Sequence, residues 1–123
     1  MKVTEIAFTC YAVANLPKAR EFYEGVLGLT PGNVWEKDGL GFIEYEIGQH
    51  TLAIGAGAPA FKPGILGATV ALEVDDFDGF VKKLRAAKVA FSMEPHDSPV
   101  CRMTLVNDYD GNQVMIHQRK KKA

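Results

Sequence analysis

The sequence has few cysteines and no long apolar run, and its glycines and prolines form no low-complexity tract. The two cysteines among its 123 residues, Cys10 and Cys101, lie far apart and outside any Cys-x-x-Cys spacing. This pattern excludes a disulfide-rich scaffold and predicts two buried, reduced thiols. The twelve glycines and six prolines are scattered along the chain, which excludes collagen-like sequence.

Hydrophobic segments that would target the chain to a membrane are also missing. No apolar stretch approaches the roughly 20 residues that a membrane-spanning helix needs. Residues 1–9 include a lysine but no apolar core typical of a signal peptide. We therefore expect a cytoplasmic protein without a membrane partner.

The charge balance gives no sign of a nucleic-acid partner. The formal net charge is −1, from 14 basic and 15 acidic side chains. Four of the basic residues stand together at 119–122, so the body of the chain is acidic. Because phosphate backbones are bound by basic stripes, we expect no nucleic-acid binding. The basic tail, residues 119–123, is expected to be a solvated, frayed terminus.

Hydrophobic periodicity predicts a strand, a helix and three strands, followed by the same order again. In the first half Asn15 is expected to cap the helix and Gly28 to end it, and in the second half Asp76 is the expected cap. The expected strands cover 3–13, 33–37, 40–47, 50–55, 68–75, 90–94, 100–107 and 113–118. The prolines near His96 predict a loop at that histidine.

The two halves repeat each other at an offset of 61 residues. Val13-Ala14-Asn15-Leu16 aligns with Val74-Asp75-Asp76-Phe77. Neither half has enough apolar surface to be stable alone, so the repeat predicts two similar modules sharing one core. We predict a single α+β domain over 1–123, with module 1 at about 1–55, a linker at 56–66, module 2 at about 67–118 and then the tail.

Three motifs resemble the vicinal oxygen chelate superfamily, which includes glyoxalase I, bleomycin resistance proteins and extradiol dioxygenases. They are the segment 13–29, the strand-to-helix segment 71–76, and Asp108-Tyr109-Asp110-Gly111-Asn112, in which Tyr109 replaces the usual proline. The resemblance implies two βαβββ modules whose curved mixed sheets surround a central cavity, and a homodimer. In metal-binding members, a divalent ion in that cavity polarises two neighbouring substrate oxygens.

The family's four metal-ligand positions fall, by this resemblance, on Phe8, Ala53, Thr69 and Met115. None of these side chains offers the carboxylate or imidazole that Mg, Mn, Fe or Zn requires. Phe8 and Thr69 are themselves 61 residues apart, as the repeat requires. We therefore expect no metal and no cofactor, and a cavity with an apolar centre that binds a small-molecule ligand.

Five further residues are candidates for ligand binding: Trp35, Phe42, Arg102, Gln113 and His117. The aromatic pair either stacks on a planar ligand or completes the core. Arg102 is the only arginine inside a predicted strand, so it either binds an acidic ligand group or forms a salt bridge with a carboxylate on a neighbouring strand. Gln113 and His117 are expected to orient a ligand from the polar edge.

Glu73 is the candidate catalytic residue. It shares a strand face with Thr69, which the resemblance turns inward. In a partly dry cavity the pKa of this carboxyl would be raised and the group would suit a general base. At a solvated strand end it would instead be an ordinary charged residue.

These observations favour a metal-independent binder of a small hydrophobic or aromatic ligand in the inter-module cavity. The alternative is a lyase or dioxygenase of the same superfamily, with Glu73 as general base or with a shifted metal site at Glu73 and His117. A third hypothesis is a regulatory module that kept the fold and lost its ligand.

Overall fold

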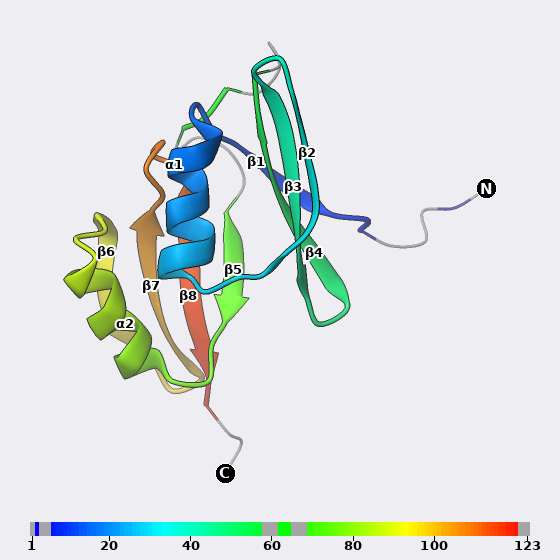
Figure 1. The fold of residues 1–123 in the computed structure, drawn as a ribbon. Coiled ribbons are helices and arrows are strands. Elements are labelled where there is room, and N and C mark those ends of the chain that lie inside the picture. Colours follow the sequence, from blue (N-terminus) through cyan, green and yellow to red (C-terminus); the bar gives the residue numbers. More distant parts are fainter. Residues whose placement is uncertain (1, 3–5, 58–61, 65–68, 121–123) are drawn as a thin grey trace. The chain divides into compact units, whose positions relative to one another are not determined.

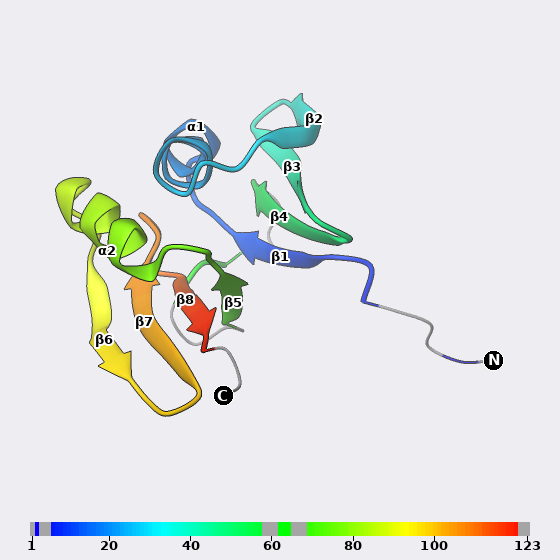
Figure 2. The ribbon, with the colours of Figure 1, turned by 90° about the horizontal axis from the view of Figure 1, so that it is seen from below.

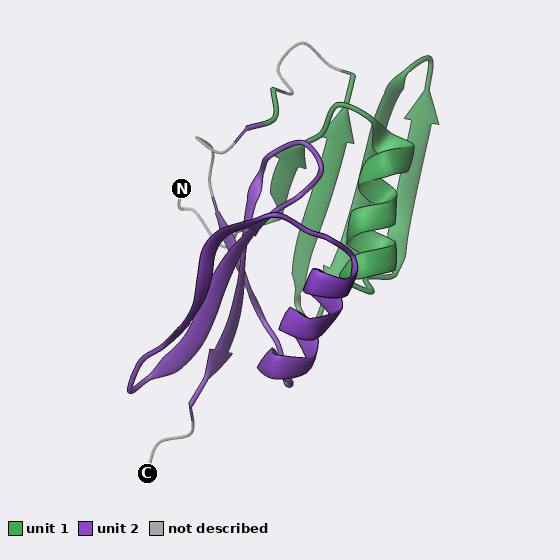
Figure 3. Cartoon of the chain, turned by 90° about the vertical axis from the view of Figure 1, so that its left-hand side faces the viewer, with its two compact units in different colours: residues 1–63 green, residues 64–123 purple. Residues whose placement is uncertain are grey.

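The computed structural model describes residues 2, 6–57, 62–64 and 69–120 (Figure 1). The chain divides into two compact units, 1–63 and 64–123 (Figure 3). Each unit contains one four-stranded mixed sheet and the predicted βαβββ order. The expected α+β class, built from two repeated modules, is confirmed, while their union in one domain stays a prediction.

The first sheet has the strand order β1-β4-β3-β2, with β1 parallel to β4 and the other neighbours antiparallel. Its strands are β1 (Thr9–Ala12), β2 (Pro31–Lys37), β3 (Leu40–Ile47) and β4 (His50–Ala56). The strand predicted over 3–13 is therefore shorter than expected, and residues 3–5 lie outside the described residues. Asp38-Gly39 and Gly48 have positive φ, which the predicted hairpin turns require.

The helix of the first unit begins as predicted but changes its winding. The Lys18 amide donates to the Asn15 side chain at 3.0 Å, capping α1 (Leu16–Arg20). The helix then continues as the π-helical segment η1 (Glu21–Val26), in which the Leu27 amide bonds to the Phe22 carbonyl five residues back. This wider turn accommodates two adjacent apolar pairs that are all buried, Phe22–Tyr23 and Val26–Leu27.

One face of the first sheet packs against α1 and η1 through an aromatic core (Figure 2). The Tyr23 ring stacks on Tyr45 with ring centroids 6.0 Å apart. The Tyr45 hydroxyl donates to Glu24 Oε2 at 2.9 Å, and Arg20 Nε donates to the same oxygen at 2.7 Å. The half-buried Glu24 carboxylate at the end of this core thus accepts hydrogen bonds on both of its oxygens.

The second unit repeats the arrangement, with strand order β5-β8-β7-β6 and a helix on one face (Figure 2). The Gly79 amide donates to the Asp76 side chain at 3.1 Å, so Asp76 caps the helix as predicted. The elements are β5 (Val70–Glu73), α2 (Phe77–Ala86), β6 (Phe91–Asp97), β7 (Cys101–Asn107) and β8 (Gln113–Arg119).

The loop expected at His96 is wrong, because β6 continues through it to Asp97. The pairing of β6 with β7 has two register shifts, one between Phe91 and Met93 and one between Met93 and His96. After the second shift His96 pairs with Met103. Since β6 is an edge strand, Pro95 removes no inner hydrogen bond and the strand tolerates it.

The tail begins as part of the sheet, so the frayed terminus predicted for 119–123 is wrong at its first two residues. Arg119 is the last residue of β8. The Lys120 amide donates to the Val100 carbonyl at 3.0 Å, and its ammonium group pairs with Asp97. Residues 121–123 lie outside the described residues. Within the described ranges, no helix has the length and apolar character needed to cross a membrane.

Candidate functional site

Four predicted ligand-binding residues lie together on the face of the first sheet opposite α1. Trp35 pairs with Phe42 across β2 and β3, and Ala53 on β4 pairs with Glu44. The Phe8 and Phe42 rings meet edge to face with centroids 5.6 Å apart. Phe8 is 46% exposed and Trp35 is 52% exposed. We call Phe8, Trp35, Phe42 and Ala53 the aromatic face.

The sequence analysis missed polar residues on the same side of this sheet. Asn33 Nδ2 donates to Glu44 Oε1 at 2.8 Å. Strand alternation from Phe42 predicts the position of Glu44, which could have been found in this way. Cys10 pairs with Ala53 and is half-buried, and this burial raises the pKa of its thiol. The raised pKa favours the thiol over the thiolate form at neutral pH.

The open face of the second sheet, opposite α2, carries the other predicted residues except Arg102. Met115 on β8 pairs with Ala71 on β5, and His117 pairs with Glu73. Thr69 Oγ1 lies 3.4 Å from Gln113 Oε1. The alternate residues of β8, Val114 and Ile116, are fully buried on the α2 side of the sheet.

A carboxylate–imidazole pair stands at the edge of this open face. His117 Nδ1 lies 2.6 Å from Glu73 Oε1, and the Arg119 amide donates to Glu73 Oε2 at 2.7 Å. The hydrogen bond from the Arg119 backbone, and then that from His117, lower the pKa of the Glu73 carboxyl. This direction agrees with the ordinary charged residue that the sequence left open for Glu73, and not with the raised pKa of a general base in a dry cavity.

Arg102 does not share this face. It pairs with Gln118 in the register and extends to α2, where its guanidinium lies 2.8 Å from Asp78 Oδ1 and 4.6 Å above the Phe77 ring. The hydrogen bond to Asp78 raises the pKa of Arg102. The carboxylate that it meets comes from the helix and not from a neighbouring strand.

The residues at the family's metal positions do not fit a hard divalent ion. Phe8 and Ala53 lie on the aromatic face, and Thr69 and Met115 lie on the open face of the second sheet. Only the hydroxyl of Thr69 is an oxygen donor, and it is directed to Gln113. Nowhere in the described ranges do three His, Cys, Asp or Glu side chains come close enough to share one ion.

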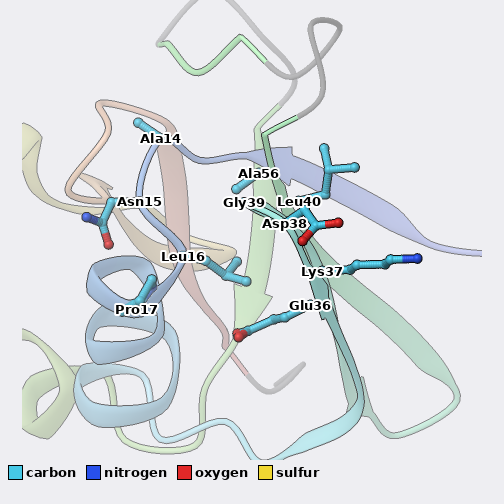
Figure 4. Close-up of a pocket in the computed structure, with 10 residues that line it drawn as sticks. All are labelled: Ala14, Asn15, Leu16, Pro17, Glu36, Lys37, Asp38, Gly39, Leu40 and Ala56. Carbon is cyan, nitrogen blue, oxygen red and sulfur yellow. The ribbon is translucent and has the colours of Figure 1, made fainter.

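A separate pocket of about 420 Å³ lies in the first unit between the start of α1 and the β2–β3 hairpin (Figure 4). Leu16 and Glu36 face each other across it, and Lys37 extends away (Figure 4). Glu36 Oε1 lies 3.9 Å from Arg20 Nη1. None of the predicted site residues lines this pocket.

Two βαβββ units, each with one sheet face left open by its helix, define the vicinal oxygen chelate class of folds. Residues 5–116 match the family described as the Glyoxalase/Bleomycin resistance protein/Dioxygenase superfamily, and the chain belongs to that family. The family expected from the sequence motifs is therefore confirmed. A comparison with curated protein sequences gave no match.

Solved structures share the fold at low sequence identity. TnmS3, an antibiotic-binding protein from Streptomyces sp. CB03234, is 21% identical with a TM-score of 0.80, over 98% of this chain and 99% of that one. A superfamily member from Sphaerobacter thermophilus DSM 20745 is 23% identical (TM-score 0.74; 94% and 98% covered). The fosfomycin resistance protein FosX from Mesorhizobium loti is 16% identical (TM-score 0.71; 94% and 92% covered). At these identities the likeness concerns the fold alone.

Proposed function

We propose that this protein binds a small hydrophobic or aromatic molecule without a divalent metal, and that the aromatic face is part of its binding surface. The observation that carries the proposal is the exposure of Phe8 and Trp35 beside Phe42. Large exposed aromatic side chains that gather on one face of a folded domain commonly mark a binding site. TnmS3 is described as an antibiotic-binding protein, which supports a small-molecule ligand.

Sequestration of the ligand is favoured over its turnover. The proposed general base, Glu73, has a lowered pKa, and both of its oxygens already accept hydrogen bonds. A base in that state has little tendency to take a proton at neutral pH. Phe8, at a position where metal-binding relatives carry a ligand, supplies apolar contact surface instead of a metal donor.

Trp35 provides the test, because it is the only tryptophan of the chain. We would titrate the protein with 8-anilinonaphthalene-1-sulfonate, a planar amphipathic probe, and follow Trp35 emission. We expect saturable quenching that EDTA does not change. Phe42→Ala should weaken binding by about two- to tenfold, which corresponds to the roughly 0.5–1.5 kcal/mol of an aromatic pair.

Val34→Ala is the matched control. Val34 adjoins Trp35 on β2 and is similarly exposed, at 48%, but it pairs with Ile43 on the α1 side of the sheet. This variant should bind the probe as the wild type does. Equal losses from the Val34 and Phe42 variants, or quenching that disappears with EDTA, would refute the proposal.

A further inference from the structure

Soft metal-binding side chains gather on the open face of the second sheet. The three methionines within the described residues all lie there, Met93 on β6, Met103 on β7 and Met115 on β8. Two of the three histidines of the chain, His96 and His117, flank Met103 in the strand register. An apolar surface alone would not need imidazoles among its thioethers.

Three of these residues are neighbours in the strand register. Met103 is directly opposite His117 in the antiparallel pair of β7 and β8, and Met115 precedes His117 by two residues on the same face. Directly opposite side chains have Cβ atoms about 4.5–5.5 Å apart, and diagonal neighbours about 7–8 Å. Methionine is long and flexible, so both sulfurs can reach an ion held by the imidazole. All three residues are half-buried.

Glu73 holds the histidine in the state that a metal ligand needs. Glu73 Oε2 accepts a hydrogen bond from the Arg119 amide at 2.7 Å, and His117 Nδ1 lies 2.6 Å from Glu73 Oε1, which places a carboxylate oxygen as the acceptor for a proton on Nδ1. The other ring nitrogen, Nε2, then has a free electron pair with which it can bind a metal. A carboxylate that orients the remote nitrogen in this way is typical of metal-binding histidines.

We propose that His117 Nε2 and the thioether sulfurs of Met103 and Met115 bind one soft monovalent metal ion, Cu(I), with Glu73 as a positioning residue. Thioether and imidazole donors suit Cu(I), whereas Mg²⁺, Ca²⁺ and Mn²⁺ prefer oxygen ligands. The site lies entirely on the second sheet. It is independent of the aromatic face, so either proposal can fail without the other.

The test is an anaerobic titration with Cu(I) in competition with the chromogenic chelator bicinchoninate. It uses the C10S/C101S variant, because the two free cysteines would otherwise compete for the ion. We expect one equivalent of Cu(I) to bind. On this background M103L, M115L and H117N should each weaken binding more than E73Q does, and E73Q should cost roughly tenfold or more. Leucine keeps the volume and apolar character of methionine, so the fold is retained.

M93L and H96Q are the matched controls, since both residues lie on the same face but on β6. Neither substitution should change the Cu(I) affinity. Addition of Ag(I), an air-stable analogue, should shift the methyl NMR signals of Met103 and Met115 but not that of Met93. Loss of Cu(I) binding in C10S/C101S, equal weakening by M93L and M103L, or Zn(II) binding as tight as that of Cu(I) would overturn the proposal. If the methionines serve only as apolar surface, the C10S/C101S variant should bind no Cu(I).

Discussion

The hydroxyl of Tyr45 allows a quantitative test of the polar network beneath the first helix. Tyr45 is fully buried, and Tyr45→Phe removes only the donor that lies 2.9 Å from Glu24 Oε2. Burial, and then the hydrogen bond to Glu24, raise the pKa of Tyr45 far above its ordinary value. The hydroxyl therefore remains a donor across the whole pH range in which the fold can be studied.

The loss of stability in Tyr45→Phe depends on the hydrogen bonds that Glu24 still accepts after the substitution. A hydrogen bond to a charged group stabilises a fold by roughly 1.5–3 kcal/mol. After the substitution Glu24 still accepts from Arg20 at 2.7 and 3.2 Å, and its side chain is 24% exposed. We therefore expect the lower limit, a loss of about 1.5 kcal/mol in the free energy of unfolding. For a chain of this length that corresponds to a decrease in Tm of roughly 5 °C.

Urea denaturation, followed by circular dichroism and Trp35 fluorescence, measures this loss. A double-mutant cycle with Glu24→Gln should give a coupling of about 1 kcal/mol. Burial by itself raises the pKa of Glu24, but the hydrogen bonds from Arg20 and Tyr45 outweigh it and the pKa is lowered below 4.5. The coupling should thus be complete above pH 4.5 and vanish as the pH falls through the lowered pKa. A Tyr45→Phe variant as stable as the wild type at pH 7 would refute the reasoning.

Three further predictions concern the second sheet, the metal content and the assembly. Because the pKa of Glu73 is lowered in the folded protein, its contacts stabilise the fold above its ordinary pKa of 4.5. The stability difference between wild type and Glu73→Gln should therefore shrink below pH 4.5. Acid titrations followed by circular dichroism measure this difference. Elemental analysis of untagged protein, purified without chelators, should find no stoichiometric Ni, Zn, Fe or Mn; one equivalent lost on His117→Ala would contradict this. Light scattering at micromolar concentration should give twice the chain mass, and a monomer would argue against the homodimer.

The fold could be predicted well because its local signals agree with its packing. The helix caps Asn15 and Asp76 accept the expected backbone hydrogen bonds, and the strand predicted over 40–47 has the observed limits. The apolar residues that recur at steps of three and four in the first helical segment are all buried: Leu16, Ala19, Phe22, Tyr23, Val26 and Leu27. Hydrophobic spacing and turn chemistry each favour the same element order, which makes such predictions dependable.

The candidate site was harder to predict, because its geometry depends on neighbours that lie far away in sequence. The two irregularities in β6 shift its register, so counting alternate residues from Phe91 gives no reliable face for His96. The pKa of Glu73 depends on an amide 46 residues away, at Arg119. The winding of η1 likewise follows from packing Phe22 and Tyr23 on the sheet and has no clear signal in the helical spacing.

Arg102 provides a last test, which separates the two faces of the second sheet. The sequence left two roles open for Arg102, binding an acidic ligand or pairing with a carboxylate on a neighbouring strand. Its position over Phe77 and beside Asp78 instead makes it a link between β7 and α2. Arg102→Gln should therefore lower Tm by less than Tyr45→Phe does, since exposed ion pairs contribute little. Asp78→Asn should lower it similarly, because it removes the same pair. Both variants should keep probe and Cu(I) binding unchanged. If Arg102→Gln abolished ligand binding while Tm stayed constant, the face assigned to Arg102 would be wrong, and an acidic ligand would have to reach the α2 side of the sheet.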